Sequence, residues 1–343
     1  MKKLLNTLYI TSEDGYLSLE GENVVVISGD EIKGRVPLHN LDGIVSSGFR
    51  DASPALMNKC TKDNISLCFL SGTGRFLAGV TGEQKGNVLL RKEQYRISDN
   101  EERSIKYARN FILGKLYNSK YIIERAARDY SMRLDSARLK VISLELSDSM
   151  NDVKMCMSHD ELRGIEGKSA ARYFSVFDEM ILQQKNDFRF EGRNKRPPMD
   201  NVNAMLSFAY TLLALMCASA LEAVGLDSYV GFMHTDRPGR RSLALDMMEE
   251  LRSVFADRFV LSLINKRLVS GKGFKKAENG AVLMDDDTRK VFFTEWQKRK
   301  TEVITHPFLK EKVEWGVVPY TQALLLARTI RGDLDEYPPF LWK

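Results

Sequence analysis

Near residues 85–100 the hydrophobic pattern changes from strand-like to helix-like, and this change restricts the possible folds strongly. Before it, short runs are β-branched or alternate apolar and polar residues, as strands do. Those runs are Leu8–Ile10, Tyr16–Leu19, Val24–Ile27, Ile32–Leu38 and Ile65–Leu70. After it, apolar residues recur at helical intervals, as at Ile105, Ala108, Ile112 and Leu116. The sequence therefore predicts an α+β protein, with a small N-terminal β domain followed by a larger, mostly α-helical C-terminal domain.

The same pattern gives domain boundaries. We expect residues 1–85 to form the β-rich domain, residues 86–100 to contain the linker and the start of the first long helix, and residues 101–343 to form the helical domain. Ser53 followed by Pro54 predicts the start of a helix inside the β-rich domain. Asn279-Gly280 predicts the turn of a hairpin near residues 274–284.

One segment, Ala204–Val224, is almost wholly apolar and nearly long enough to cross a bilayer. Polar and small residues interrupt it, and it has no aromatic belt at its far end. We expect a central helix of the helical domain, and no membrane partner. The N-terminus lacks the features of a signal peptide. The four cysteines stand singly without a CxxC pair, which suits a reducing cytoplasm and excludes a disulfide framework.

Positive charge is mild overall but clustered. The net charge is +5, and basic residues gather at Arg193–Arg196, Arg237–Arg241 and Lys272–Lys276. Any one of these runs, taken alone, is most simply a solvated loop. Together they permit an anionic partner, because clustering matters more than the total charge.

A first candidate site surrounds Glu166, which is flanked by Gly164 and Gly167. The glycines would let a ligand approach the carboxylate. Lys168 and Arg172, four residues apart, are expected on one side of a helix. The simpler interpretation is a helix N-terminus at which Glu166 complements the helix dipole.

A second candidate site is His234, which precedes a Pro-Gly loop rich in arginine. A lone histidine is usually structural, but here carboxylates follow closely in Ser242–Arg252, a predicted helix with Ser242 as its possible cap. Asp246 and Glu249 are three residues apart, so their side chains project toward one region. The simpler interpretation of these acids is a solvated helix face.

Together, the acids and the imidazole suit one Mg or Mn ion. A basic rim would surround the ion, and its members are Lys168, Arg172, Arg237, Arg240 and Arg241. A metal inside a basic rim fits phosphodiester chemistry, because the cation neutralises a phosphate while the rim holds the DNA backbone.

Six segments also match a known family pattern: Asn87–Arg96, Leu162–Gly167, Arg196–Pro198 followed by Asn203–Ala204, His234–Arg240, Ser242–Arg252 and Asp257–Phe259. On these residues the sequence resembles the CRISPR-associated adaptation integrase, the "Cas-one" family, of a subtype I-C kind. The resemblance covers essentially the whole chain. Asn201 and Ser253 stand where the pattern has proline, which affects the stiffness of loops more than the site.

The resemblance implies that Glu166, His234 and Glu249 bind the metal, with Asp246 as a further acidic residue near the catalytic site. It implies a β domain that forms homodimer contacts, and DNA joining in which a 3′-hydroxyl attacks a phosphodiester of a repeat. The implied partners are double-stranded DNA, a small second adaptation protein that bridges two dimers, and a nuclease that trims fragments.

Two other functions remain open from the residues. A DNA-binding scaffold without chemistry would use the same basic runs, but would need neither His234 nor the acids. A metal nuclease that only hydrolyses DNA would share the site.

Overall fold

A computed structural model of the chain describes residues 7–10, 15–41, 43–47, 51–63, 65–70, 76–80, 82, 88–194 and 196–343. Asn87 and Lys195, which the sequence analysis used, lie outside the described residues. Contacts divide the chain into two compact units. Unit 1 comprises residues 1–85, 284–302 and 314–317, and unit 2 comprises the remainder.

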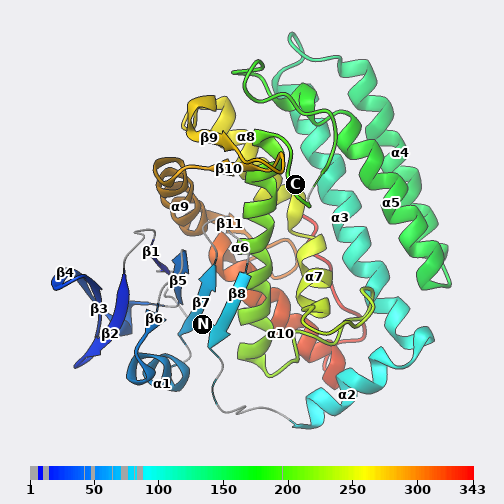
Figure 1. Cartoon of the computed structure of the whole chain (residues 1–343). Coiled ribbons are helices and arrows are strands. Elements are labelled where there is room, and N and C mark those ends of the chain that lie inside the picture. Colours follow the sequence, from blue (N-terminus) through cyan, green and yellow to red (C-terminus); the bar gives the residue numbers. More distant parts are fainter. Residues whose placement is uncertain are drawn as a thin grey trace. The chain divides into compact units, whose positions relative to one another are not determined.

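Unit 1 contains two small sheets (Figure 1). The first has the order β1-β5-β7-β8, in which β8 is antiparallel to β7 and the other pairs are parallel. The second has the order β4-β3-β2-β6, in which only the β2–β6 pair is parallel. The strands are β1 (Thr7–Ile10), β2 (Tyr16–Glu20), β3 (Asn23–Ser28), β4 (Glu31–Pro37), β5 (Gly43–Ser47), β6 (Asp51–Ala52), β7 (Ser66–Leu70) and β8 (Phe76–Val80).

The predicted cap of the first helix is confirmed. Helix α1 (Pro54–Lys62) begins after Ser53, whose Oγ accepts a hydrogen bond from the Leu56 backbone N–H at 3.2 Å. Leu56 and Cys60 of this helix join the apolar core of the sheets. The 3₁₀ helix η1 (Leu38–Asn40) contributes Leu38 to the same core.

Unit 1 also takes one helix from late in the chain. Helix α9 (Asp286–Thr301) packs on the 3₁₀ helix η5 (Trp315–Val317), and Phe293 of α9 stacks on Tyr9 of β1 with ring centroids 4.4 Å apart. The predicted boundaries place every residue after 100 in the helical domain, whereas the contacts group α9 with the strands. The hydrophobic period of a segment predicts that the segment is a helix, but it does not predict which part of the fold that helix packs against.

Unit 2 is mostly helical, and the predicted α+β class, with strands first and helices after, is confirmed. Its helices are α2 (Val88–Ser98), α3 (Glu101–Asp129), α4 (Ser136–Met155), α5 (His159–Ser175), α6 (Asn201–Val224), α7 (Ser242–Glu249), α8 (Arg258–Asn265) and α10 (Val318–Arg331). Its short segments are η2 (Asp178–Met180), η4 (Gly271–Gly273), β11 (Val303–Thr305) and the predicted hairpin of β9 (Phe274–Lys276) and β10 (Val282–Met284). The strand β12 (Lys312–Glu314) pairs with β11.

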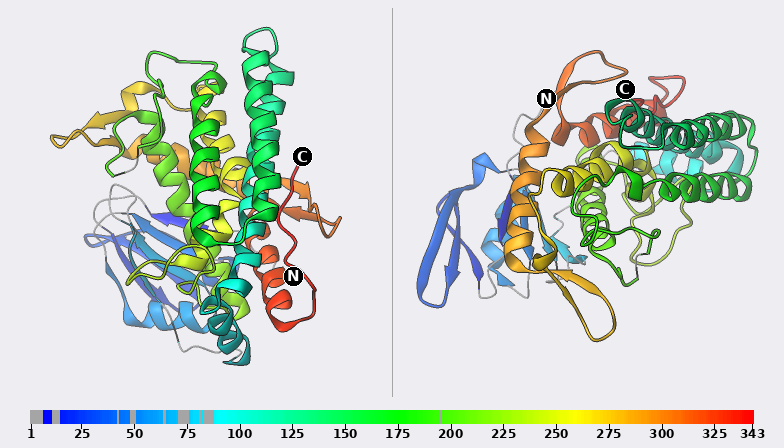
Figure 2. Two further views of the ribbon diagram at one scale, coloured as in Figure 1. Left: turned by 90° about the vertical axis from the view of Figure 1, so that its right-hand side faces the viewer. Right: turned by 90° about the horizontal axis from the view of Figure 1, so that it is seen from above.

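Long helices lie side by side in unit 2. Helix α3 packs against α4 and α5, and α4 also packs against α5 (Figure 2). Side-chain caps set where they begin: Asn100 caps α3, Asp135 caps α4 and Ser158 caps α5.

The apolar segment forms helix α6, as predicted. Its residues 201–223 have the length and hydropathy of a membrane span, but 61% of its apolar window is buried inside the chain. It packs against α10, α7 and a π-helical segment, η3 (Arg252–Asp257), which continues α7 into α8. The position of α6 in the core of unit 2 accounts for its composition.

Candidate metal centre

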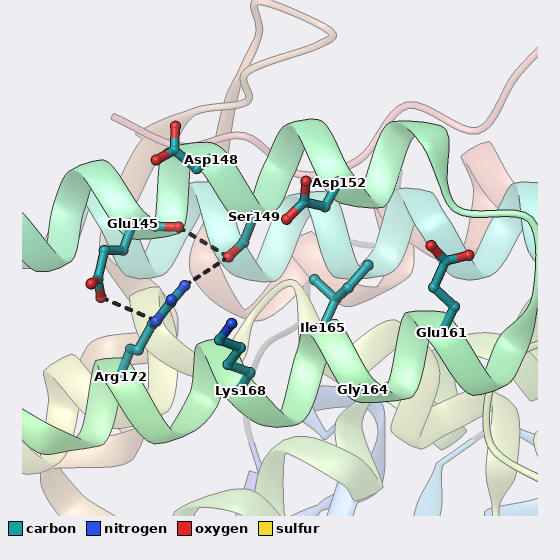
Figure 3. A pocket seen from close by; sticks show the side chains of 9 residues that line it. All are labelled: Glu145, Asp148, Ser149, Asp152, Glu161, Gly164, Ile165, Lys168 and Arg172. Carbon is teal, nitrogen blue, oxygen red and sulfur yellow. Dashed lines mark hydrogen bonds and ion pairs between the residues drawn. The ribbon is translucent and has the colours of Figure 1, made fainter.

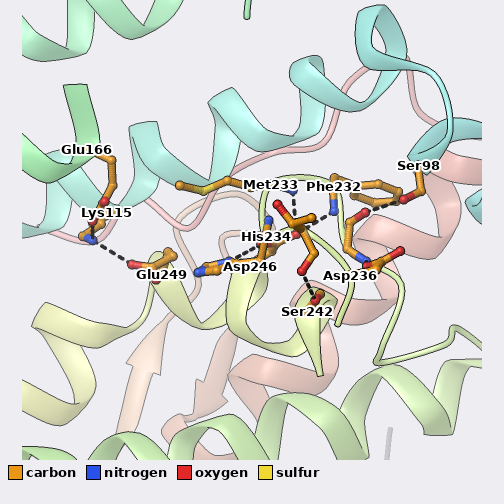
Figure 4. Close-up of polar contacts among 12 residues, drawn as sticks. Ser98, Lys115, Glu166, Phe232, Met233, His234, Asp236, Ser242, Asp246 and Glu249 are labelled. Atoms are coloured by element: carbon orange, nitrogen blue, oxygen red, sulfur yellow. Dashed lines mark hydrogen bonds and ion pairs between the residues drawn. The ribbon is translucent and has the colours of Figure 1, made fainter. Parts of the chain in front are cut away.

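The loop that carries His234 is tied to helix α7 by one carboxylate, that of Asp246. Its Oδ2 accepts hydrogen bonds from the backbone N–H groups of Phe232 at 2.6 Å and Met233 at 2.9 Å. Its Oδ1 accepts one from the backbone N–H of His234 at 3.0 Å (Figure 4). Asp246 is fully buried, so these charge-assisted bonds fix the loop against the helix.

The same carboxylate orients the imidazole. The Nδ1 of His234 lies 2.5 Å from Asp246 Oδ1. A carboxylate accepts the hydrogen, so in the neutral imidazole Nδ1 carries it and Nε2 presents a lone pair. Carboxylates hold the imidazoles of metal-binding histidines in this way. The His234 side chain is 18% exposed, so a ligand can reach it.

Helix α2 holds the other end of the loop, which the sequence alone did not predict. The buried Gln94 side chain donates to the carbonyls of Asp227 and Val230, both at 2.8 Å, and accepts from the Asp227 N–H at 2.9 Å. Ser98 Oγ donates to the Gly231 carbonyl at 2.7 Å. The available signal was a glutamine in line with Leu90 and Ile97 on the buried face of α2.

Glu249 lies one helical turn after Asp246 and is only 3% exposed. Its Oε1 is 2.9 Å from an Arg252 guanidinium nitrogen, and its Oε2 is 2.8 Å from Lys115 Nζ. Burial alone would raise the pKa of Glu249, but the charges of Arg252 and Lys115 lower it below its ordinary value. Glu249 is therefore a buried carboxylate that stays ionised.

Glu166 reaches the same place from helix α5. It lies in the middle of that helix, so the interpretation of Glu166 as a dipole-complementing residue at a helix N-terminus is wrong. Its Oε1 is in close contact with Lys115 Nζ (Figure 4). Lys115 of α3 thus stands between two of the predicted metal ligands, and it was not among the predicted site residues. A lysine within the apolar run Phe111–Leu116 was the signal for it.

The donor set fits a divalent cation. Two carboxylates and an imidazole with a free Nε2 are the oxygen and nitrogen donors that Mg or Mn accept. Glu249 Oε2 is buried and accepts no well-formed hydrogen bond, although it has the ionic contact with Lys115. In the described part of the chain, no three acidic, histidine or cysteine side chains are close enough together to hold an ion. Between Glu166 and Glu249 that space is taken by the Lys115 ammonium.

The Pro-Gly loop beside His234 concentrates positive charge. Arg237 is exposed, and Arg240 and Arg241 are half-buried. Arg241 stacks on Tyr229, with its guanidinium 5.6 Å from the ring centroid. Burial lowers the pKa of Arg240, and the neighbouring charge of Arg237 lowers it further. Cations that repel one another in this way favour an anionic ligand. The predicted cap at Ser242 is wrong, because Arg241 is the capping residue and Ser242 begins α7.

Lys168 and Arg172 line a different surface. They face a cavity of about 410 Å³ between α4 and α5, lined also by Glu145, Asp148, Asp152 and Glu161 (Figure 3). Arg172 Nε is 3.1 Å from Glu145 Oε2. These two basic residues thus share a helix with Glu166, while the arginines of the Pro-Gly loop adjoin His234.

Comparison with known proteins matches this chain to the family model described as "CRISPR associated protein Cas1", over residues 8–298. A relative from Chlorobaculum tepidum, named "CRISPR-associated endonuclease Cas1 1", is 49% identical over 344 residues, which covers 100% of both chains.

Two solved structures share the fold. A casposase bound to an integration product has a TM-score of 0.84 at 22% identity, and the match covers 98% of this chain and 93% of that one. A chain of a "Cas6-RT-Cas1--Cas2 complex" has a TM-score of 0.82 at 20% identity, covering 100% of this chain and 36% of that one.

Proposed function

This chain belongs to the CRISPR-associated Cas1 family, and from that premise we propose that it is a metal-dependent DNA integrase of CRISPR adaptation. It inserts short DNA fragments into a repeat array by transesterification, using the 3′-hydroxyl of the fragment as nucleophile. The observation that carries the proposal is the approach of Glu166 and Glu249 to one point, beside an imidazole with a free Nε2. A DNA-binding scaffold would need none of these.

Glu166, Glu249 and His234 Nε2 would hold the cation, Mg or Mn. When bound, it would supply Lewis-acid stabilisation of the phosphate and a lower pKa for the attacking hydroxyl. Asp246 keeps the proton on His234 Nδ1 and holds the loop in place. Arg237, Arg240 and Arg241 would bind the DNA backbone, as would Lys168 and Arg172 from their separate surface.

The partners proposed are double-stranded DNA, a second copy of this chain, a small second adaptation protein and a trimming nuclease, in a subtype I-C-like system. The names of the similar proteins support DNA and the small protein: one binds an integration product, and another is a complex with Cas2. The β-rich unit would form the dimer contacts. A cytoplasmic location is proposed with them.

The deciding experiment incubates the protein and its small partner with labelled fragments and a repeat-bearing plasmid, with manganese. Fragments with a 3′-hydroxyl should be joined, whereas fragments ending in a dideoxy nucleotide should not. Equal products from both would exclude the integrase, and plasmid nicking without joining would identify a nuclease that only hydrolyses.

Variants then test the residues. Glu249→Gln and His234→Ala should lose metal-dependent joining by about 10–100-fold or more while DNA binding persists. His39→Ala is the matched control, because His39 is exposed and belongs to unit 1. Full activity of Glu249→Gln and His234→Ala at limiting manganese would show that the metal is held elsewhere.

A further inference from the structure

Lys115 has an uncommon position for a lysine. It lies on the buried face of α3 and is 8% exposed. Lysine is almost never buried without a partner. Here the ammonium has two acidic partners on two other helices, Glu166 of α5 and Glu249 of α7. Three helices thus converge on one nitrogen atom.

The ammonium takes the oxygen that a metal would need. Glu249 Oε1 is already paired with Arg252 at 2.9 Å, so Oε2 is the oxygen that remains for a ligand. Lys115 Nζ lies 2.8 Å from that Oε2 and in close contact with Glu166 Oε1. A cation held by these two carboxylates would stand where the ammonium stands.

Charge makes simultaneous occupancy unfavourable. Glu166 and Glu249 are balanced by Lys115 and Arg252, so this group of four is neutral as it stands. A divalent ion beside an unmoved ammonium would meet a like charge at short range in a buried setting, where repulsion is strong. The lysine stem is flexible, so its charge can move aside. Arg252 is held by Tyr210, whose ring centroid lies 5.0 Å from its guanidinium.

We propose that Lys115 is a built-in counter-ion that occupies the cation position between Glu166 and Glu249, and that a metal ion must displace it to bind. This inference rests on the proposed metal centre. Lys115 then has two effects: it stabilises the metal-free fold by neutralising two carboxylates, and it weakens metal affinity by competing for them. Arg252 stays paired with Glu249 in both states.

The test measures Mn²⁺ binding by calorimetry and thermal melting in EDTA, on the full chain. Lys115→Met keeps the length of the side chain and removes its charge. In EDTA the variant should melt at a lower temperature than wild type. It should bind Mn²⁺ roughly tenfold more tightly or better, and a tenfold change corresponds to about 1.4 kcal/mol. Saturation with Mn²⁺ should therefore raise its melting temperature by more than it raises that of wild type. If Lys115 were purely structural, its replacement would lower stability without tightening Mn²⁺ binding.

Three further variants complete the design. Lys115→Arg keeps the charge and should bind Mn²⁺ no more tightly than wild type. Lys120→Met is the matched control on the same helix. The Lys120 Nζ lies 3.7 Å from Glu124 Oε1 and not at the metal centre. Lys115→Gln, which can still donate hydrogen bonds to both carboxylates, replaces the methionine variant if that variant does not fold.

The outcomes separate the two proposals. Unchanged or weaker Mn²⁺ binding by folded Lys115→Met or Lys115→Gln, with binding that still depends on Glu249, overturns the role of Lys115 and leaves the metal centre standing. Mn²⁺ binding that Glu249→Gln does not affect overturns the metal centre, and the role of Lys115 with it. Tighter binding by Lys115→Met that Glu249→Gln abolishes supports both.

Discussion

Replacing Asp246 with asparagine should change the tautomer of His234, and the structure gives the reason. The two carboxylate oxygens accept from four donors, the backbone N–H groups of Phe232, Met233 and His234 and the His234 Nδ1–H. Asparagine has one accepting oxygen and an NH₂ group, which is itself a donor. It can therefore satisfy only one pair of these donors.

The two orientations of the new amide differ in cost. If its oxygen serves the histidine pair, the NH₂ group faces the N–H groups of Phe232 and Met233, and two buried donors lose their partners. If it serves Phe232 and Met233, only the His234 backbone N–H is orphaned, because the ring can move its hydrogen to Nε2 and accept at Nδ1. An orphaned buried donor costs about 1–3 kcal/mol, so the second orientation is favoured. Nε2 then carries a hydrogen and no longer binds metal.

Three measurements follow for Asp246→Asn. Urea unfolding should show a loss of roughly 1–3 kcal/mol, and Mn²⁺ affinity should fall about 10–100-fold. Nitrogen NMR of the histidine ring should report hydrogen on Nε2. Asp236→Asn is the control from the same loop, since Asp236 is exposed and accepts one backbone hydrogen bond, from Gly231 at 3.2 Å. A destabilised Asp246→Asn with wild-type Mn²⁺ affinity would refute the tautomer argument.

Three other predictions follow. Burial raises the pKa of the Glu250 carboxyl from 4.5 to about 7, although hydrogen bonds from its partners oppose the shift. The contribution of Glu250 to the free energy of unfolding is therefore complete below about pH 4.5, and it falls by roughly 3 kcal/mol as the pH rises from there through 7. The free energy of unfolding of Glu250→Gln, measured with urea at pH 5 and pH 8, should not show this loss. An equal pH dependence in wild type and Glu250→Gln would contradict the prediction. Replacing Arg237, Arg240 and Arg241 by alanine should weaken DNA binding and reduce its salt slope by about one for each lost phosphate contact; an unchanged slope would assign these residues to a solvated loop. Ile32 is 47% exposed on β4, an edge strand of unit 1. If the β-rich unit forms the proposed dimer contacts, Ile32→Asp should shift sedimentation toward monomer, and sedimentation equal to that of wild type would contradict this.

The sequence predicted those helices and strands whose defining residues lie within the element or next to it. Ser53 and Pro54 determined the start of α1, and the apolar segment became α6. Helix α2 was predicted only as a linker and the start of the first long helix, not as a helix of its own. Val88 and Leu89 are exposed and only Leu90, Gln94 and Ile97 face inward, which is too few apolar positions for a clear period. Strands β5 and β8 were missed because each is short and carries a glycine.

The candidate site was predictable only as a set of residue types. The pattern around His234, Asp246 and Glu249 indicated a metal, but their roles depend on where the helices place them. Asp246 faces the backbone of the His234 loop, and Glu249, three residues later, faces Arg252 and Lys115. Nothing in the neighbourhood of Lys115 in the sequence relates it to either acid, because their approach depends on the packing of α3 against α5 and α7.

The π-helical segment η3 has a consequence for how the length of the chain can vary. It begins at Arg252, with two residues between it and the end of α7 at Glu249, and at its end Asp257 accepts a hydrogen bond from Tyr210 at 2.5 Å. A π turn holds one residue more than an α turn. Losing that residue would restore a regular helix but rotate α8 by about 100° relative to α7. Either Glu249 would leave Arg252 and Lys115, or Asp257 would leave Tyr210. Substitutions can therefore accumulate in this segment over evolutionary time, whereas insertions and deletions should be strongly selected against.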